Sequence, residues 1–271
     1  MGKNLTAAFI LLVIYLPLFA QQQLPAGQNF YADGREGIVY NRELSFDFKL
    51  VTPRSFALGV NFGQLKTYYR TRLYNIEIGD LRHSREFRQS FDIQLPNTNT
   101  VSNPFIFGKQ NQLYVLRASI GEKRYLSEKA RRKGLAVGFS YFAGPAIGFL
   151  KPYYLNLIYY NDQGPRPIIR PERYSPNNGD TFLDIYNVYG AAPWSKGLGE
   201  VKLLPGLHAK AAAHFDWGAF DELVKAIEAG VMVDFFFRDA PIMVESPQTP
   251  GVKNTPVFVN FFLNLQLGKR R

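Results

Sequence analysis

The segment 257–268 alternates between apolar side chains and mostly polar or small ones, and it constrains the fold more than any other stretch. Its apolar positions are Val257, Val259, Phe261, Leu263, Leu265 and Leu267. Successive side chains of a β-strand point to opposite faces, so this segment predicts a strand with one apolar and one wet face. Roughly 9–11 residues cross a bilayer as a tilted strand. We therefore interpret 257–268 as the closing strand of an outer-membrane β-barrel.

Similar alternation recurs along the chain and predicts nine strands, or ten with an uncertain one at 87–95. The nine cover 37–50, 56–65, 69–79, 113–121, 135–143, 147–159, 201–215, 227–235 and 257–268. A short helix over 220–227 is an alternative, because its apolar residues also fit a helical spacing. Single-chain bacterial barrels have even strand numbers, so we predict about ten strands, with eight or twelve as alternatives. Lipid offers no hydrogen-bond partner to the backbone of a free sheet edge, so every strand must pair on both sides. The predicted fold is therefore an all-β, antiparallel, closed barrel.

The composition agrees with a barrel and excludes several kinds of site. Aromatic residues make up 15% of the chain, including 23 Phe and 16 Tyr, which is typical of aromatic girdles at membrane interfaces. A mean hydropathy of -0.17 is too polar for a helical membrane protein but fits strands that face water at every second residue. The absence of cysteine excludes disulfides, thiolate metal sites and cysteine nucleophiles. No phosphate-binding glycine loop or metalloprotease motif occurs, so we expect no cofactor.

Residues 1–20 have the organisation of a secretory signal peptide. Lys3 gives a positive start, 5–20 is an apolar run, and Ala20 precedes three glutamines. A retained membrane helix is the alternative, but the run is shorter than the ~20 residues that a spanning helix needs and contains Pro17. The predicted segments are a signal peptide at 1–20, a periplasmic lead-in at 21–36 and an integral outer-membrane barrel domain at 37–271.

The wet faces of the predicted strands collect charges of both signs. The predicted polar network of the lumen comprises Glu43, Asp47, Arg117, His208, Lys210, Glu228 and Asp234, and the same faces carry Lys49, Glu77 and Lys202. Opposite charges should pair across a narrow lumen, since an unpaired buried charge costs far more than a paired one. We interpret the interior as plugged by an ionic network. A narrow polar pore lined by the same residues is the alternative.

Two basic connections are the strongest candidates for contact with other molecules. The chain has a formal charge of +10, which favours an anionic membrane surface over nucleic acid for a secreted protein. The segments 122–133 and 161–199 are rich in Lys and Arg, and we place the long, Pro-rich, structureless second one outside the cell. The candidate contacts to glycolipid phosphates, as in lipopolysaccharide, are Lys123, Arg124, Arg131, Arg132, Arg166 and Arg170. Solvated charged loops without a dedicated partner are the alternative.

Several short motifs resemble those of a family of integral outer-membrane β-barrel proteins from Bacteroidota-type bacteria. They are Phe62-Gly63, Lys66-Thr67, Arg70-Thr71-Arg72, Asp80-Leu81-Arg82-His83, Phe107-Gly108-Lys109, Leu150-Lys151-Pro152-Tyr153-Tyr154-Leu155, Lys196-Gly197-Leu198 and Pro205-Gly206-Leu207. The resemblance extends over most of the segment after the predicted signal peptide. It implies an outer-membrane location and no assigned reaction.

These observations favour a non-enzymatic barrel that serves as a structural or accessory subunit of an outer-membrane complex. Its loops would bind outer-membrane proteins or glycolipid, and nucleic acid is not an expected partner. A small porin-like channel or transporter is the second hypothesis, and a soluble lipocalin-like barrel is the structural rival.

A lipid-modifying hydrolase is a minor alternative, because the two histidines His208 and His214 share the predicted lumen with Ser140 and Glu228. No flanking motif supports such a site. Metal binding by His208 and His214 is no better supported, since six residues of strand separate their Cα atoms by roughly 20 Å.

Overall fold

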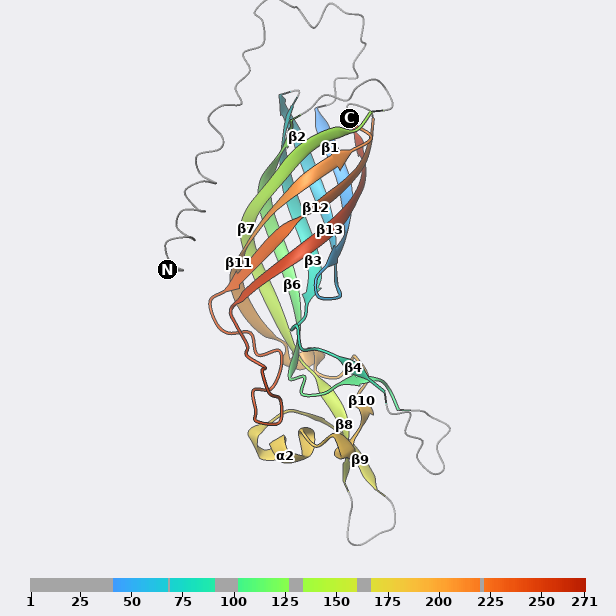
Figure 1. The fold of residues 1–271 in the computed structure, drawn as a ribbon, viewed down its shortest axis with the longest axis vertical. Helices are drawn as coiled ribbons and strands as arrows, with labels where there is room; N and C mark the ends of the chain where they lie inside the picture. Colours follow the sequence, from blue (N-terminus) through green and yellow to red (C-terminus); the bar gives the residue numbers. More distant parts are fainter. Residues whose placement is uncertain (1–40, 68, 91–101, 127–133, 160–166, 220–221) are drawn as a thin grey trace, which may run out of the picture. The chain divides into compact units, whose positions relative to one another are not determined.

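The computed structural model describes residues 41–67, 69–90, 102–126, 134–159, 167–219 and 222–271, all of which belong to one compact unit. Eight strands of the described residues close into an antiparallel barrel in the order β1-β13-β12-β11-β7-β6-β3-β2 (Figure 1). They are β1 (Arg42–Val51), β2 (Ser55–Thr67), β3 (Arg70–Leu81), β6 (Asn111–Tyr125), β7 (Ala136–Pro152), β11 (Lys202–Asp216), β12 (Leu223–Phe236) and β13 (Val257–Arg270). The predicted all-β antiparallel barrel is thus confirmed. The predicted signal peptide and lead-in lie outside the described residues.

The barrel closes between β1 and β13 without a break in register. Their paired residues run from Glu43 opposite Arg270 to Val51 opposite Phe262. At the end of this seam, Arg271 N donates to Arg42 O at 2.8 Å and Arg42 N donates to Arg271 O at 2.7 Å. The last strand therefore closes the sheet and leaves no free edge along the barrel, as the hydrocarbon of a membrane would require.

The prediction of ten strands is wrong, and eight, given as an alternative, is the observed number. The main cause is β7, which runs through Gly144 and Pro145 and so joins the two strands predicted at 135–143 and 147–159. The β6–β7 ladder lacks pairs opposite these two residues, whereas the β7–β11 ladder keeps them. Pro145 has no backbone N–H to donate, but β7 continues as a strand on both sides of it. The uncertain strand at 87–95 is represented among the described residues only by β4 (Arg88–Gln89).

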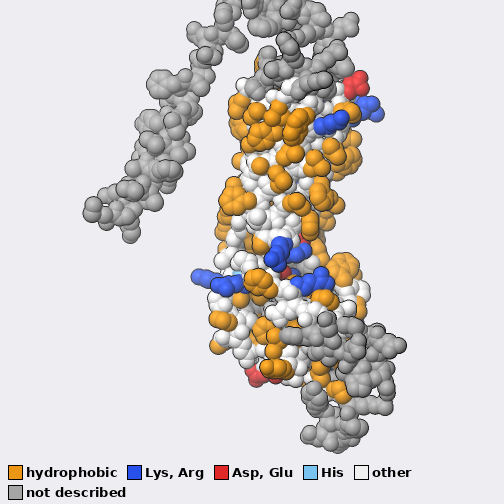
Figure 2. Space-filling view, turned by 45° about the vertical axis from the view of Figure 1, so that its right-hand side comes forward, with side chains coloured by type: hydrophobic (Ala, Val, Ile, Leu, Met, Phe, Trp, Pro, Cys, Tyr) orange, Lys and Arg blue, Asp and Glu red, His pale blue; other side chains and the backbone are white. Residues whose placement is uncertain are grey.

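The wall of the barrel is apolar outside and polar inside. Phe46, Ile76 and Phe261 expose 59%, 54% and 65% of their surface, while their neighbours Asp47 and Glu77 are buried. This inverts the arrangement of a soluble barrel, whose apolar side chains fill the interior. Figure 2 shows hydrophobic side chains covering the barrel wall on one face, with Lys and Arg gathered toward its ends. The sequence alternation predicted these two faces correctly.

The two ends of the barrel differ in the length of their connections. At one end lie 68–69, 126–135 and 217–222, together with the first residue of β1 and the last of β13; we call this the termini end. At the other end lie the connections 52–54, 82–110, 153–201 and 237–256, which we call the loop end. Three of these four are long, so most of the chain outside the barrel is gathered at the loop end (Figure 1).

The loop end carries a small folded extension rather than the structureless stretch expected for 161–199. The strands β8 (Tyr154–Tyr159), β9 (Ile168–Arg173) and β10 (Val188–Ala191) form a sheet in the order β10-β8-β9. The extension also contains η2 (Pro176–Asn178), α2 (Gly179–Phe182), η3 (Ile185–Asn187) and η4 (Leu198–Glu200), while β5 (Phe105–Ile106) pairs with β4. Its core comprises Phe105, Leu155, Leu157, Phe182, Leu183, Val188 and Val244. Among the described residues, no helix has the length and apolar character needed to cross a membrane.

Candidate functional site: a filled lumen and a cationic cavity

Arg117 on β6 is the centre of an ion-pair network that crosses the lumen. Its guanidinium contacts both carboxylate oxygens of Asp234 on β12, with Nε–Oδ1 at 2.7 Å and Nη2–Oδ2 at 2.9 Å. Its Nη1 donates to Oε1 of Glu77 on β3 at 2.9 Å. All three side chains are almost completely buried. A buried bidentate arginine–carboxylate pair makes each partner depend on the other, because removing one leaves the other charge buried and unpaired.

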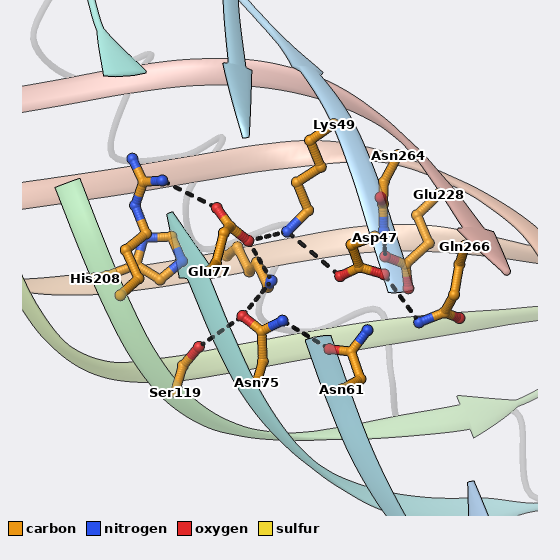
Figure 3. A network of polar contacts seen from close by, with 12 residues as sticks. Asp47, Lys49, Asn61, Asn75, Glu77, Ser119, His208, Glu228, Asn264 and Gln266 are labelled. Atoms are coloured by element: carbon orange, nitrogen blue, oxygen red, sulfur yellow. Dashed lines mark hydrogen bonds and ion pairs between the residues drawn. The ribbon is translucent and has the colours of Figure 1, made fainter. Parts of the chain in front are cut away.

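Glu77 also binds two lysines from other parts of the barrel wall. Lys49 of β1 donates to Oε2 of Glu77, and Lys210 of β11 donates to the same oxygen at 3.1 Å. Lys49 Nζ lies 3.7 Å from Asp47, which accepts a hydrogen bond from Gln266 at 3.2 Å. Figure 3 shows Lys49 and Glu77 meeting in the interior, with Asp47 and Gln266 beside them. The contacts connect β1, β3, β6, β11, β12 and β13 across the lumen.

Neutral polar side chains extend the central network toward β2. Asn75 accepts from Lys210 at 3.1 Å and from Ser119 at 3.4 Å, and its Nδ2 donates to Asn61 at 2.7 Å (Figure 3). Asn61 in turn donates to Ser45 at 3.3 Å. These amides and hydroxyls satisfy one another beside the charged Lys210, as buried polar groups require.

A second ionic cluster fills the lumen at the termini end around Arg270. Arg270 Nε donates to Glu43 at 3.0 Å, and Nη2 donates to Asp216 at 2.6 Å and to the Tyr125 hydroxyl at 3.1 Å. Tyr125 donates to Asp216 at 2.6 Å, and Lys123 donates to Glu43 at 2.7 Å. One guanidinium therefore joins the closing seam to β11 and β6.

The two histidines occupy separate sites in the lumen. His208 Nδ1 lies 3.0 Å from Asp234 Oδ1, whereas His214 Nδ1 lies 3.0 Å from Glu228 Oε1. Ser140 donates to that same oxygen of Glu228 at 2.8 Å. Ser140 and His214 thus both contact Glu228, while His208 lies at Asp234. Ser140 donates to the carboxylate rather than to a histidine, so these contacts do not form the Ser–His–Glu order of a hydrolase triad. The described residues contain no group of His, Asp or Glu side chains arranged to hold a metal ion.

The charges inside the barrel nearly cancel. The buried carboxylates of the lumen are Glu43, Asp47, Glu77, Asp216, Glu228 and Asp234, and the buried cations are Lys49, Arg117, Lys123, Lys210 and Arg270, with His208 and His214 beside them. The seven residues predicted for the lumen all lie in this set. Lys202, which the alternation also placed inside, is exposed, and it precedes the part of β11 that pairs with β12, which begins at Gly206. The positive excess of the chain therefore lies outside the lumen.

Apolar side chains close the lumen at its loop end. Ala240, Ile242 and Met243 of the β12–β13 connection are buried and belong to one cluster with residues of the barrel wall. That wall contributes Leu81, Leu113, Val115, Ala146, Leu150, Leu204 and Phe236. Ile242 O accepts from Gln110 N at 2.8 Å and from Asn111 N at 3.0 Å, which ties the connection to the start of β6. Apolar side chains of the wall and of this connection thus pack against one another across the mouth.

A cavity of about 490 Å³ lies at the loop end between the barrel and the extension strands. Its lining comes from the β1–β2 turn, the 82–112 region, the β7–β8 junction and residues 191–196. The cationic side chains in the lining are Arg54, Arg82, Arg88, Lys109, Lys151 and Lys196, whereas Glu86 is the one carboxylate among the described lining residues. The cavity therefore favours an anionic occupant.

The basic residues predicted to contact phosphates are not brought together. Lys123 is buried in the lumen on Glu43, which contradicts the expected surface role. Arg124 pairs with Glu122 at 3.2 Å and belongs to the termini end, whereas Arg170 lies in β9 at the loop end. The connection 122–133 and the segment 161–199 thus belong to opposite ends of the barrel, so they cannot both face outward. Arg131, Arg132 and Arg166 lie outside the described residues.

Sequence reasoning missed several residues of the network and all those that form the cavity. Asp216 and Arg270 continue the wet faces of their strands by one or two positions, so a longer alternation window would have found them. Lys151 and Pro152 fall within the strand predicted at 147–159, whereas in the structure they end β7, and Lys151 lines the cavity. No local pattern brings Glu86, Lys109 and Lys151 together, because their proximity depends on the folded loop end.

No protein-family model and no curated protein matches this chain. One similar solved structure is that of Ail, the attachment invasion locus protein of Yersinia pestis, in complex with the heparin analogue sucrose octasulfate. The two chains are 10% identical, the likeness covers 85% of this chain and 97% of Ail, and the TM-score is 0.38. At these values the likeness assigns neither residues nor ligands to this chain.

Proposed function

We propose that this protein is an integral outer-membrane β-barrel that acts through binding at its loop end, as a structural or accessory subunit, and neither conducts solutes nor catalyses a reaction. The observation that carries the proposal is the contrast between the two parts of the molecule. The lumen is filled by paired charges and closed by an apolar cluster, whereas the loop end offers a cationic cavity and a folded extension.

The membrane location rests on the outer face of the barrel. A closed ring of strands with Phe, Leu and Ile outward and ion pairs inward is stable in lipid, where exposed backbone edges and outward charges are costly. A soluble lipocalin-like protein would expose this large apolar surface to water. Membership of the Bacteroidota-type family, the cleaved signal peptide and the binding of lipopolysaccharide stay predictions.

The orientation follows from the lengths of the connections. Barrels of bacterial outer membranes have short periplasmic turns and longer extracellular loops. The termini end has the short connections and the loop end has three long ones, so we place the loop end outside the cell. The extension and the cavity would then meet molecules of the outer leaflet or of the surroundings.

Planar-bilayer recording separates this proposal from the channel alternative. We expect the purified protein to give no steady ion conductance, because paired charges around Arg117 and the apolar cluster at Ile242 and Met243 occupy the lumen. A steady conductance that changes with Lys210→Ala would contradict the proposal and establish a pore lined by the lumen residues. Heat-modifiable gel migration of the same sample verifies that the recorded protein is folded.

A further inference from the structure

Lys151 differs from every other buried lysine of the described residues. Lys49 and Lys210 pair with Glu77, Lys109 pairs with Glu86 at 2.6 Å, and Lys123 pairs with Glu43. Lys151 is only 4% exposed, and no carboxylate of the described residues lies within ion-pair distance of it. Its ammonium lies 5.3 Å from the centre of the Trp194 ring. A buried cation without a counter-charge is costly, so an anionic ligand beside Lys151 would be favourable.

The surroundings of Lys151 strengthen this inference, because they are positively charged as well. Arg54, Arg88 and Lys196 line the same cavity without a carboxylate partner among the described residues, while Lys109 and Arg82 are neutralised by Glu86 and Asp80. Arginines and lysines around one cavity suit a phosphate group, which accepts several charge-assisted hydrogen bonds at once.

The cavity also provides aromatic surfaces and a hydroxyl donor. Phe87, Tyr153, Tyr154 and Trp194 belong to its lining, and aromatic rings of this kind offer apolar faces to a sugar ring. Burial raises the pKa of Tyr153, so its hydroxyl stays protonated. That oxygen accepts from Ile106 N at 3.3 Å and keeps its own hydrogen for donation. A volume of about 490 Å³ lies within the range of small-molecule sites.

We propose that the loop-end cavity binds the phosphate monoester of a phosphorylated saccharide, with Lys151 as the principal counter-charge and Trp194 as the wall beside it. The inference rests on the proposed function, because it names the chemistry that the loop end binds. The same phosphosugar group occurs on soluble sugar phosphates and on the headgroups of outer-leaflet glycolipids. The cavity recognises the shared group, and the experiment distinguishes the two sources.

Three variants of the full chain test the site by titration calorimetry with glucose 6-phosphate, with glucose as the uncharged comparison. We expect the folded protein to bind glucose 6-phosphate and to bind glucose at least about tenfold more weakly. Lys151→Met should weaken glucose 6-phosphate binding by about tenfold or more, since the main charge-assisted contact is lost. Lys202→Met is the matched control, because Lys202 is exposed, pairs in register with Leu150 and does not line the cavity.

Glu86→Gln provides a change of opposite sign that misfolding cannot imitate. It removes the carboxylate that holds Lys109 while retaining an oxygen that accepts from His83 N, so glucose 6-phosphate should bind severalfold more tightly. The inference is overturned if the folded wild type does not bind glucose 6-phosphate. It is equally overturned if Lys151→Met binds as the wild type does, if Lys202→Met loses as much affinity, or if Glu86→Gln loses affinity.

The source of the phosphosugar is determined in nanodiscs with and without phosphorylated lipid A. Competition by lipid A against glucose 6-phosphate supports the inference and assigns the site to a glycolipid headgroup. Undiminished binding of glucose 6-phosphate in both nanodiscs supports it and assigns the site to a soluble ligand. If the protein binds no phosphosugar and gives no conductance in bilayers, only this inference is wrong. If it gives a steady conductance, the proposed function is wrong.

Discussion

Arg117→Met is expected to lower the free energy of unfolding by about 3–5 kcal/mol, which is the usual cost of removing one partner of a buried ion pair. Methionine fills much of the space but leaves Asp234 with only His208 beside it, and it removes one of the three cations around Glu77. Urea unfolding of the protein in lipid vesicles, followed by heat-modifiable gel migration, measures the difference. Arg238→Met, at an exposed arginine after β12, is the control and should change stability by less than about 0.5 kcal/mol.

Adding Asp234→Asn to Arg117→Met should restore part of the lost stability. Asp234→Asn removes the carboxylate that Arg117→Met leaves without its arginine, while Glu77 keeps Lys49 and Lys210. Two independent polar contacts would instead give two additive losses. A double variant less stable than Arg117→Met would therefore contradict the view that the lumen charges compensate one another.

Arg270→Met is expected to have a comparable effect at the termini end and to weaken barrel closure. Arg270 lies opposite Glu43 in the β1–β13 seam and binds Asp216 of β11 and Tyr125 of β6, so its loss removes contacts between the last strand and other parts of the wall, including the opposite side. We expect about 3–5 kcal/mol of destabilisation and a smaller folded fraction after refolding into vesicles. Arg270→Lys should recover only part of this, because an ammonium cannot reproduce the several directed contacts of a guanidinium.

Lys269→Met is the matched control for the seam. It changes the adjacent side chain, which has the same sign of charge and points outward on the same strand. If Lys269→Met reduced folding as much as Arg270→Met, the loss would reflect positive charge near the end of the chain rather than the interior contacts. Normal folding of Arg270→Met would contradict the role given to this arginine.

Strand alternation predicted the barrel and the two faces of its wall because a period of two is a local property of the chain. Phe46 and Phe48 point outward and Asp47 inward, as their alternate positions require. The strand count was wrong because Pro145 was given more weight than the alternation of inward and outward side chains, which continues past it. Outward positions continue through Tyr141, Pro145 and Ile147 without a shift, which indicates one strand, and this continuity was the available signal.

The lumen network was partly predictable, whereas the cavity was not. Charges on inward positions must find partners, so residues such as Asp234 and Arg117 could be placed inside from sequence, but not paired with each other, because the pairing depends on strand order and shear. The extension resisted prediction because its core joins Phe105, Leu157, Phe182 and Val244, which are far apart in sequence. The isolation of Lys151 appears only once these loops are folded.

Cysteine labelling on intact cells tests most directly whether the barrel spans the outer membrane with its cavity outside. The chain has no cysteine, so each introduced thiol reports one position. Lys196→Cys is at the exposed loop end and Lys269→Cys is at the termini end. We predict that a membrane-impermeant maleimide labels Lys196→Cys on intact cells and labels Lys269→Cys only after the outer membrane is permeabilised. Labelling of Lys269→Cys on intact cells, with Lys196→Cys protected or equally labelled, would contradict the account.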